Sequence, residues 1–126
     1  MIPVKLSVED EVRIIAPAQS LLPKLTLADR LRAIERLESI GLRVTFGKYI
    51  SEVDEFKSTT VEHRLRDLHD AFIDPTVKAI IAVSGGTTSN QLLPYINYDL
   101  IRSNPKILCG LSDITALNNG IYAKTG

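Results

Sequence analysis

The chain has 126 residues, a length that suits one globular domain, and 44% of them are hydrophobic and 24% charged. Its 15 basic residues balance 15 acidic ones, which excludes the positive surface of a nucleic-acid-binding protein, and its single cysteine, Cys109, excludes an internal disulfide. No run of about 18 apolar residues could span a membrane, so we expect a cytoplasmic domain with no nucleic-acid or membrane partner.

The first half of the chain predicts two strands around one helix. Residues 12–16 form a short apolar run that Pro17 ends, as in a buried strand. Apolar residues recur every three or four positions from 25 to 40, which predicts an amphipathic helix with Gly41 as its C-cap. Residues 42–46 predict a second strand, and the charged, aperiodic residues 47–58 a loop.

The second half continues the alternation. Thr59 and Glu62 predict a capping box at the start of a helix that ends before Asp74 and Pro75. Residues 79–83 predict a strand, 84–88 a loop, 89–95 a short helical turn and 106–109 a fourth strand. We therefore predict one α/β domain over residues 1–126, with a parallel Rossmann-like or flavodoxin-like sheet and helices on both faces.

The tetrapeptide 110–113, Gly-Leu-Ser-Asp, lies between the fourth strand and an apolar segment that resembles a helix. Such a turn could be a nucleophile elbow after the fourth strand, exposing the Ser112 hydroxyl near the backbone N–H groups that begin the helix. Position 114 is Ile, however, where the usual elbow has a second glycine. Ser112 could equally be a helix N-cap, with Asp113 in the first turn. These residues alone leave both interpretations open.

A second turn, Gly85-Gly86, also follows a strand, and the carboxyl ends of parallel strands meet at one edge of a sheet. This turn could bind an anion through its N–H groups, or be a plain turn. His63 and His69 are six residues apart on one helix, so neither a metal site nor a catalytic base is expected of them. We expect Cys109 to be a small core residue, and the charges between residues 62 and 70 to form a solvated helix face.

Taken together, these motifs resemble those of the LD-carboxypeptidase family of serine peptidases. Within that family they are most similar to the branch of the microcin C self-immunity peptidases. The resemblance runs over essentially the whole chain. It is carried by residues 10–17, 64–72, 78–81, 85–86, 89–96 and 104–117.

The resemblance implies that Ser112 is the nucleophile and that the N–H groups of Asp113 and of the Gly85-Gly86 turn, Gly86 above all, form the oxyanion hole. Substrate contacts are expected at Thr87, Ser89 and Asn90. The family implies no metal or organic cofactor, and a homodimer. Its substrates are L,D-peptides such as murein tetrapeptide, or peptidyl-nucleotides such as microcin C.

The family's nucleophile is activated by a His that a Glu orients, and both come from a C-terminal domain that residues 1–126 do not include. We therefore expect the isolated chain to be inactive. The chain departs from the family at Leu111, at Thr87 and Thr88, and at the helix-weakening residues 118–120. A non-catalytic α/β binding or interaction module, a truncated relic of the peptidase, is the alternative hypothesis.

Overall fold

The computed structural model describes residues 2–126 and contains a sheet of four parallel strands in the order β2-β1-β3-β4. The strands are β1 (Glu11–Ile15), β2 (Arg43–Phe46), β3 (Val77–Ala82) and β4 (Ile107–Cys109). The helices are α1 (Leu27–Ser39), α2 (Val61–Ile73), α3 (Tyr98–Ser103), α4 (Ile114–Thr125) and the 3-10 helices η1 (Leu22–Lys24) and η2 (Ser89–Tyr95). The strand order is that of a flavodoxin-like sheet, and the predicted α/β fold is confirmed.

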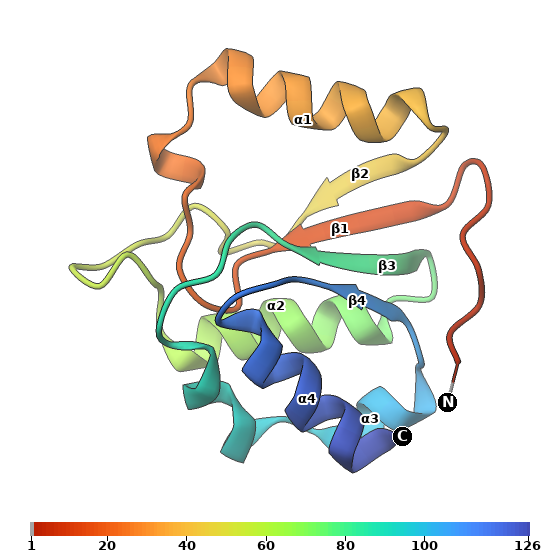
Figure 1. Ribbon diagram of the computed structural model, residues 1–126, viewed down its shortest axis with the longest axis vertical. Coiled ribbons are helices and arrows are strands. Elements are labelled where there is room, and N and C mark those ends of the chain that lie inside the picture. The colour runs from red at the N-terminus through yellow and green to blue at the C-terminus, as the bar shows by residue number, and fades with distance from the viewer. Residues whose placement is uncertain (1) are drawn as a thin grey trace.

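Helices cover both faces of the sheet, as predicted. Figure 1 shows α1 above the four strands and α2, α3 and α4 below them. Neighbouring residues of β1 point to opposite faces, because side chains alternate along a strand. Ile14 therefore packs in the cluster below α1 with Leu22, whereas Ile15 packs in the larger cluster with Leu68 and Phe72 of α2. The larger cluster also contains Ile114, Leu117 and Ile121 of α4.

Helices α1, α2 and α3 begin where a side chain accepts from a free backbone N–H group. Thr26 and Asp29 form a capping box at the start of α1. The predicted capping box of α2 is wrong by one residue: Thr60 is the N-cap and accepts from the backbone N–H of His63, 3.1 Å away. Thr59 is not free to cap, because its hydroxyl donates to the carboxylate of Glu52 at 2.8 Å.

Three expectations about individual elements are corrected by the fold. Helix α3 was not predicted; Asn97 caps it by accepting from the N–H of Leu100 at 3.0 Å. The apolar stripe of α1 is only partly covered, and Leu27 remains 71% exposed. Cys109 is exposed rather than buried. It lies on the strand farthest from β2, and its side chain points to the face that α1 covers only near β2.

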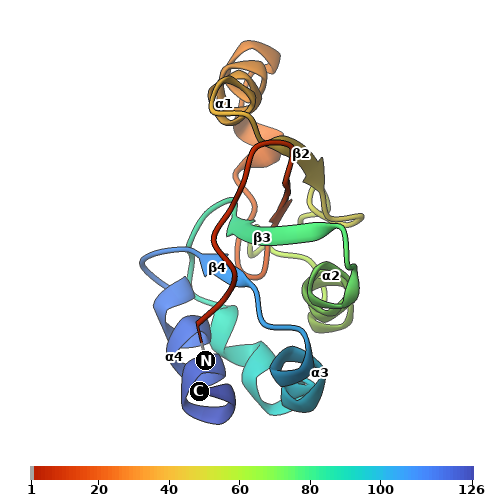
Figure 2. The ribbon, with the colours of Figure 1, turned by 90° about the vertical axis from the view of Figure 1, so that its right-hand side faces the viewer.

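The two ends of the described chain lie side by side. Figure 2 shows the N-terminal segment running across the sheet to the end of α4. Pro3 and Gly126 line the same cavity there. The cavity lies at the end of the sheet where β4 begins. Ser112 lies at the opposite end of the sheet, just after the carboxyl end of β4.

Candidate active site

The backbone around Ser112 forms a tight turn between β4 and α4. Ser112 has a φ of 59°, in the left-handed region that a serine adopts only at a cost of about 1–2 kcal/mol. Its side chain is exposed, and no hydrogen bond joins its hydroxyl to another of residues 2–126. A strained turn that holds a serine side chain outside the sheet is the geometry of a nucleophile elbow.

The alternative, that Ser112 caps the following helix, is wrong. Helix α4 begins at Ile114 and its N-cap is Asp113, which makes no side-chain capping bond. The carboxylate of Asp113 instead accepts from the N–H of Ser89, 2.9 Å away, and its carbonyl accepts from the Ser89 hydroxyl at 2.7 Å. These two bonds tie the serine turn to the start of η2. The N–H groups that begin α4 donate to backbone carbonyls of the turn instead, Thr115 to Ser112 at 3.0 Å and Ala116 to Asp113 at 3.1 Å.

The glycine turn after β3 lies directly against the serine turn. A Cβ atom placed on Gly85 would be 3.1 Å from the Ser112 Cβ, 3.3 Å from its hydroxyl and 3.4 Å from the backbone nitrogen of Asp113. These distances are tighter than most Cβ contacts, so a side chain at position 85 would require the serine turn to shift by a few tenths of an ångström. Gly86 has a φ of 147°, and a Cβ there would be 2.7 Å from the Gln19 side chain. The fold thus brings together Ser112, Asp113 and the Gly85-Gly86 turn, which the sequence had placed on separate strands.

The segment after β1 supports the same turn. The N–H of Gln19 donates to the carbonyl of Gly85 at 3.2 Å, and the Ser84 hydroxyl donates to the carbonyl of Gln19 at 2.7 Å. Strands β1 and β3 are neighbours in the sheet, but their helices lie on opposite faces. This is the switch point at which parallel α/β sheets commonly bind ligands. The glycine turn is therefore anchored by the strand that precedes it, β3, and by hydrogen bonds to the segment after β1.

The residues expected to touch substrate fall into two groups. Thr87 and Asn90 are exposed beside the glycine turn and are free to contact a ligand. Ser89 is completely buried, and both its N–H and its hydroxyl are bound to Asp113. Its observed contacts are therefore with the serine turn.

The two histidines have partners away from the serine turn. The Nδ1 atom of His63 lies 2.7 Å from the carboxylate of Glu52, and this hydrogen bond lowers the pKa of Glu52. The Nε2 atom of His69 accepts from the N–H of Asn97 at 3.0 Å, and burial lowers the pKa of His69. Among residues 2–126, no group of three His, Cys, Asp or Glu side chains could hold a metal ion.

The charged segment of α2 is not wholly a solvated face. Arg64 and Asp67 are only 3% and 5% exposed. Asp67 accepts from the N–H of Tyr49 at 2.9 Å, and burial raises its pKa. Arg64 reaches the segment that follows the glycine turn, donating to the carbonyl of Thr88 at 2.9 Å. This arginine was not expected at the site, because it lies in the charged segment 62–70, which was predicted to be solvated.

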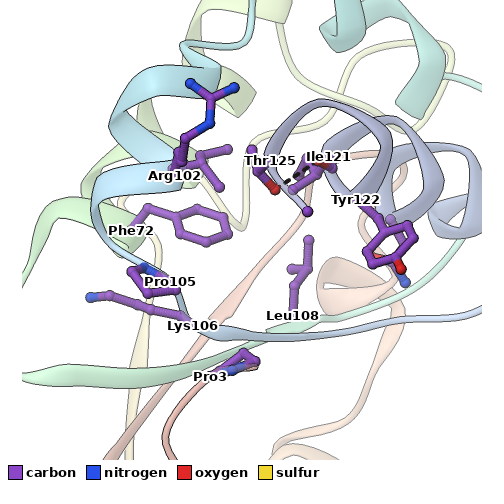
Figure 3. Close-up of a pocket in the computed structure, with 12 residues that line it drawn as sticks. Pro3, Phe72, Arg102, Pro105, Lys106, Leu108, Ile121, Tyr122 and Thr125 are labelled. Atoms are coloured by element: carbon purple, nitrogen blue, oxygen red, sulfur yellow. Dashed lines mark hydrogen bonds between the residues drawn. The ribbon is translucent and has the colours of Figure 1, made fainter. Parts of the chain in front are cut away.

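A cavity of about 260 Å³ lies elsewhere, between α3, α4 and β4. Figure 3 shows Phe72, Leu108 and Ile121 around it, with Lys106 and Tyr122 at its margins. Lys106 precedes β4 whereas Ser112 follows it, so the cavity is at the opposite end of the strand from the serine. It does not belong to the candidate site.

The fold and the site define an α/β domain that presents a serine on a strained turn against a glycine turn. The family sequence model that describes the LD-carboxypeptidase N-terminal domain matches residues 12–126. The chain belongs to the LD-carboxypeptidase family.

Proteins similar to this chain include MccF-like proteins and a murein peptide carboxypeptidase. The crystal structure of an MccF-like protein from Bacillus anthracis has 52% sequence identity and a TM-score of 0.96, covering 100% of this chain and 38% of that one. The microcin C7 self-immunity protein MccF, solved with aspartyl sulfamoyl adenosine, has 35% identity and a TM-score of 0.90 over 100% of this chain and 37% of its own. The murein tetrapeptide carboxypeptidase of Pseudomonas aeruginosa is 32% identical over 117 residues, 91% of this chain and 36% of that protein.

The chain spans between 24% and 38% of these curated relatives, and 37% of a Bacillus subtilis protein that is 51% identical to it. Another MccF structure carries alanine at three active-site positions, one of which is a serine in the unaltered protein.

Within residues 2–126, no helix is long and apolar enough to cross a membrane.

Proposed function

We propose that this chain is the nucleophile-bearing domain of a serine peptidase that cleaves L,D-peptide bonds or peptidyl-nucleotide amides. One observation carries the proposal: Ser112 lies on a left-handed turn, with Gly85 close to both its hydroxyl and the backbone nitrogen of Asp113. Ser112 would attack the scissile carbonyl and form an acyl-enzyme. The N–H groups of Asp113 and Gly86 would stabilise the oxyanion, and losing one such donor typically lowers the rate by about 10²–10³.

The proposal assigns the Glu and His of the triad to a C-terminal domain of the complete protein. Both histidines of residues 1–126 have other partners, Glu52 and Asn97. A serine without its base retains only the help of the oxyanion hole and of binding. The 126-residue chain alone should therefore hydrolyse neither substrate, while the complete protein should hydrolyse at least one.

We propose the substrate class from the relatives of the chain. One relative is a murein tetrapeptide carboxypeptidase, and MccF has been solved with aspartyl sulfamoyl adenosine. The higher identity to MccF-like proteins favours the peptidyl-nucleotide. We further propose that the complete enzyme works without a metal or organic cofactor, as a homodimer in the cytoplasm, on the basis of the family resemblance.

The test compares release of D-alanine from murein tetrapeptide with cleavage of aspartyl sulfamoyl adenosine by the complete protein. We expect turnover of at least one compound, and a loss of about 10⁴-fold or more in kcat for Ser112→Ala. Turnover of neither compound would support the alternative, a binding module that kept the scaffold without the chemistry. Turnover that survives Ser112→Ala would remove Ser112 from the mechanism.

A further inference from the structure

Arg64 is a buried arginine without a carboxylate partner. Its guanidinium donates to the carbonyls of Thr59 at 3.0 Å and Pro17 at 3.3 Å, to the carbonyl of Thr88 at 2.9 Å and to the side-chain oxygen of Gln91 at 2.6 Å. No ion pair joins it to any of residues 2–126. Burying a charge is costly, and burial lowers the pKa of Arg64, while the charges of Asp54 and Asp113 raise it. Neither carboxylate forms an ion pair with the guanidinium, which is held instead by neutral oxygen atoms.

The acceptors of Arg64 belong to the segments that surround the glycine turn. Pro17 follows β1, and two residues later Gln19 donates its N–H to Gly85. Thr88 comes two residues after Gly86, and its hydroxyl lies 2.9 Å from that of Ser58. The guanidinium therefore fixes the glycine turn on both sides, through Pro17 before it and Thr88 after it. Its planar fork suits several carbonyls at once, which a lysine ammonium cannot match.

A short path continues from Thr88 to the nucleophile. The next residue, Ser89, donates its N–H and its hydroxyl to Asp113, and Asp113 follows Ser112. The order Arg64, Thr88, Ser89 and Asp113 thus joins α2 to the serine turn by hydrogen bonds and peptide bonds alone. One proposed oxyanion donor, Asp113, lies at the end of this path, and the other, Gly86, lies two residues before Thr88.

We propose that Arg64 is a positioning residue, which holds the Gly85-Gly86 turn and the Ser112 turn in the fixed relation that oxyanion stabilisation requires. It does not touch the reacting atoms. Its effect on catalysis rests on the proposed function, whereas its effect on the two turns does not. Because the oxyanion develops only in the transition state, loosening these turns lowers kcat and leaves KM nearly unchanged.

The first experiment measures backbone amide hydrogen exchange by NMR in the 126-residue chain. In Arg64→Gln, we expect exchange to rise at least about tenfold, relative to the core strands, at the amides of Gln19 and Ser89, whose N–H groups donate to the Gly85 carbonyl and the Asp113 carboxylate. The matched control is Arg66→Gln, the same change two residues along α2, where the side chain is 53% exposed. Arg66→Gln should leave these amides unchanged. Unchanged exchange in a folded Arg64→Gln variant would overturn the proposal.

The second experiment measures steady-state kinetics of the complete protein. Arg64→Gln should lower kcat by about 10–100-fold with KM within about threefold, and Arg64→Lys should recover only part of the loss. Ser89→Ala removes one of the two hydrogen bonds between Ser89 and Asp113 on the same path, so its effect and that of Arg64→Gln should not multiply in the double variant. A raised KM with an unchanged kcat, or full recovery by lysine, would contradict the proposal.

Two controls keep the outcomes distinct. If Arg64→Gln does not fold, Arg64→Lys and Ser89→Ala decide the question by the same two readouts. If the complete unaltered protein hydrolyses neither substrate, the proposed function fails, while the exchange experiment still decides whether Arg64 holds the turns.

Discussion

Replacing Ser112 by glycine should stabilise the chain, although it removes the proposed nucleophile. Ser112 has a φ of 59°, and a left-handed residue with a Cβ costs about 1–2 kcal/mol. Glycine relieves this strain but loses about 0.5–1 kcal/mol through the greater freedom of the unfolded chain. The free energy of unfolding should therefore rise by about 0.5–1 kcal/mol, or about 2–4 °C in Tm for a domain of this size.

Two variants control this prediction, measured by urea denaturation of the 126-residue chain. Ser112→Ala keeps the Cβ and loses a hydroxyl without a hydrogen bond in residues 2–126, so its stability should stay within about 0.5 kcal/mol of the unaltered chain. Ser51→Gly makes the same chemical change at an exposed turn residue outside the left-handed region, and should destabilise by about 0.5–1 kcal/mol. The reasoning is refuted if Ser112→Gly destabilises as much as Ser51→Gly.

Two further changes test the site and the ion pairs of the fold. Gly85→Ala places a Cβ 3.1 Å from that of Ser112, so we expect kcat of the complete protein to fall about 10–100-fold. The free energy of unfolding, measured by urea denaturation, should change by less than about 1 kcal/mol. An unchanged kcat would contradict the functional importance of this close approach. Hydrogen bonds from Thr76 and then Arg13 lower the pKa of Asp74 to about 2, so its contribution is present above pH 3.8 and is lost as the pH falls through about 2. Asp74→Asn should thus destabilise by about 1–2 kcal/mol at pH 7, after allowance for solvent screening, and by about half as much at pH 3. A difference that does not change with pH would show that the charge of Asp74 is not responsible.

Local sequence patterns were sufficient for the four strands and for most helices. The alternation of apolar runs with turns identified β1 to β4, and η2 begins and ends at the predicted residues, Ser89 and Tyr95. Helix α3 was missed because its six residues carry too little periodicity to distinguish them from a loop. The fold class was predictable because short strands alternate with helices, although β2 is only half apolar.

The contacts of the candidate site depended on tertiary structure. The sequence could place Ser112 and Gly85 at strand ends, but not choose between an elbow and a cap, since that choice depends on the φ of Ser112 and the partner of Asp113. Arg64 resembles its exposed neighbour Arg66 in sequence, and only the converging carbonyls show that it is buried. The exposure of Cys109 likewise depends on which face of β4 is covered.

The central claim, that Ser112 is the nucleophile, is tested most directly by mass spectrometry. The complete protein is mixed with an acyl-adenylate analogue, quenched in acid within the first turnover and digested for peptide mapping. We expect an acyl group on Ser112, absent from Ser112→Ala and retained in Cys109→Ala. Cys109 is the sharpest competitor, because it is an exposed thiol three residues before the serine. An acyl group on Cys109, or turnover by Ser112→Ala at the unaltered rate, would contradict the account.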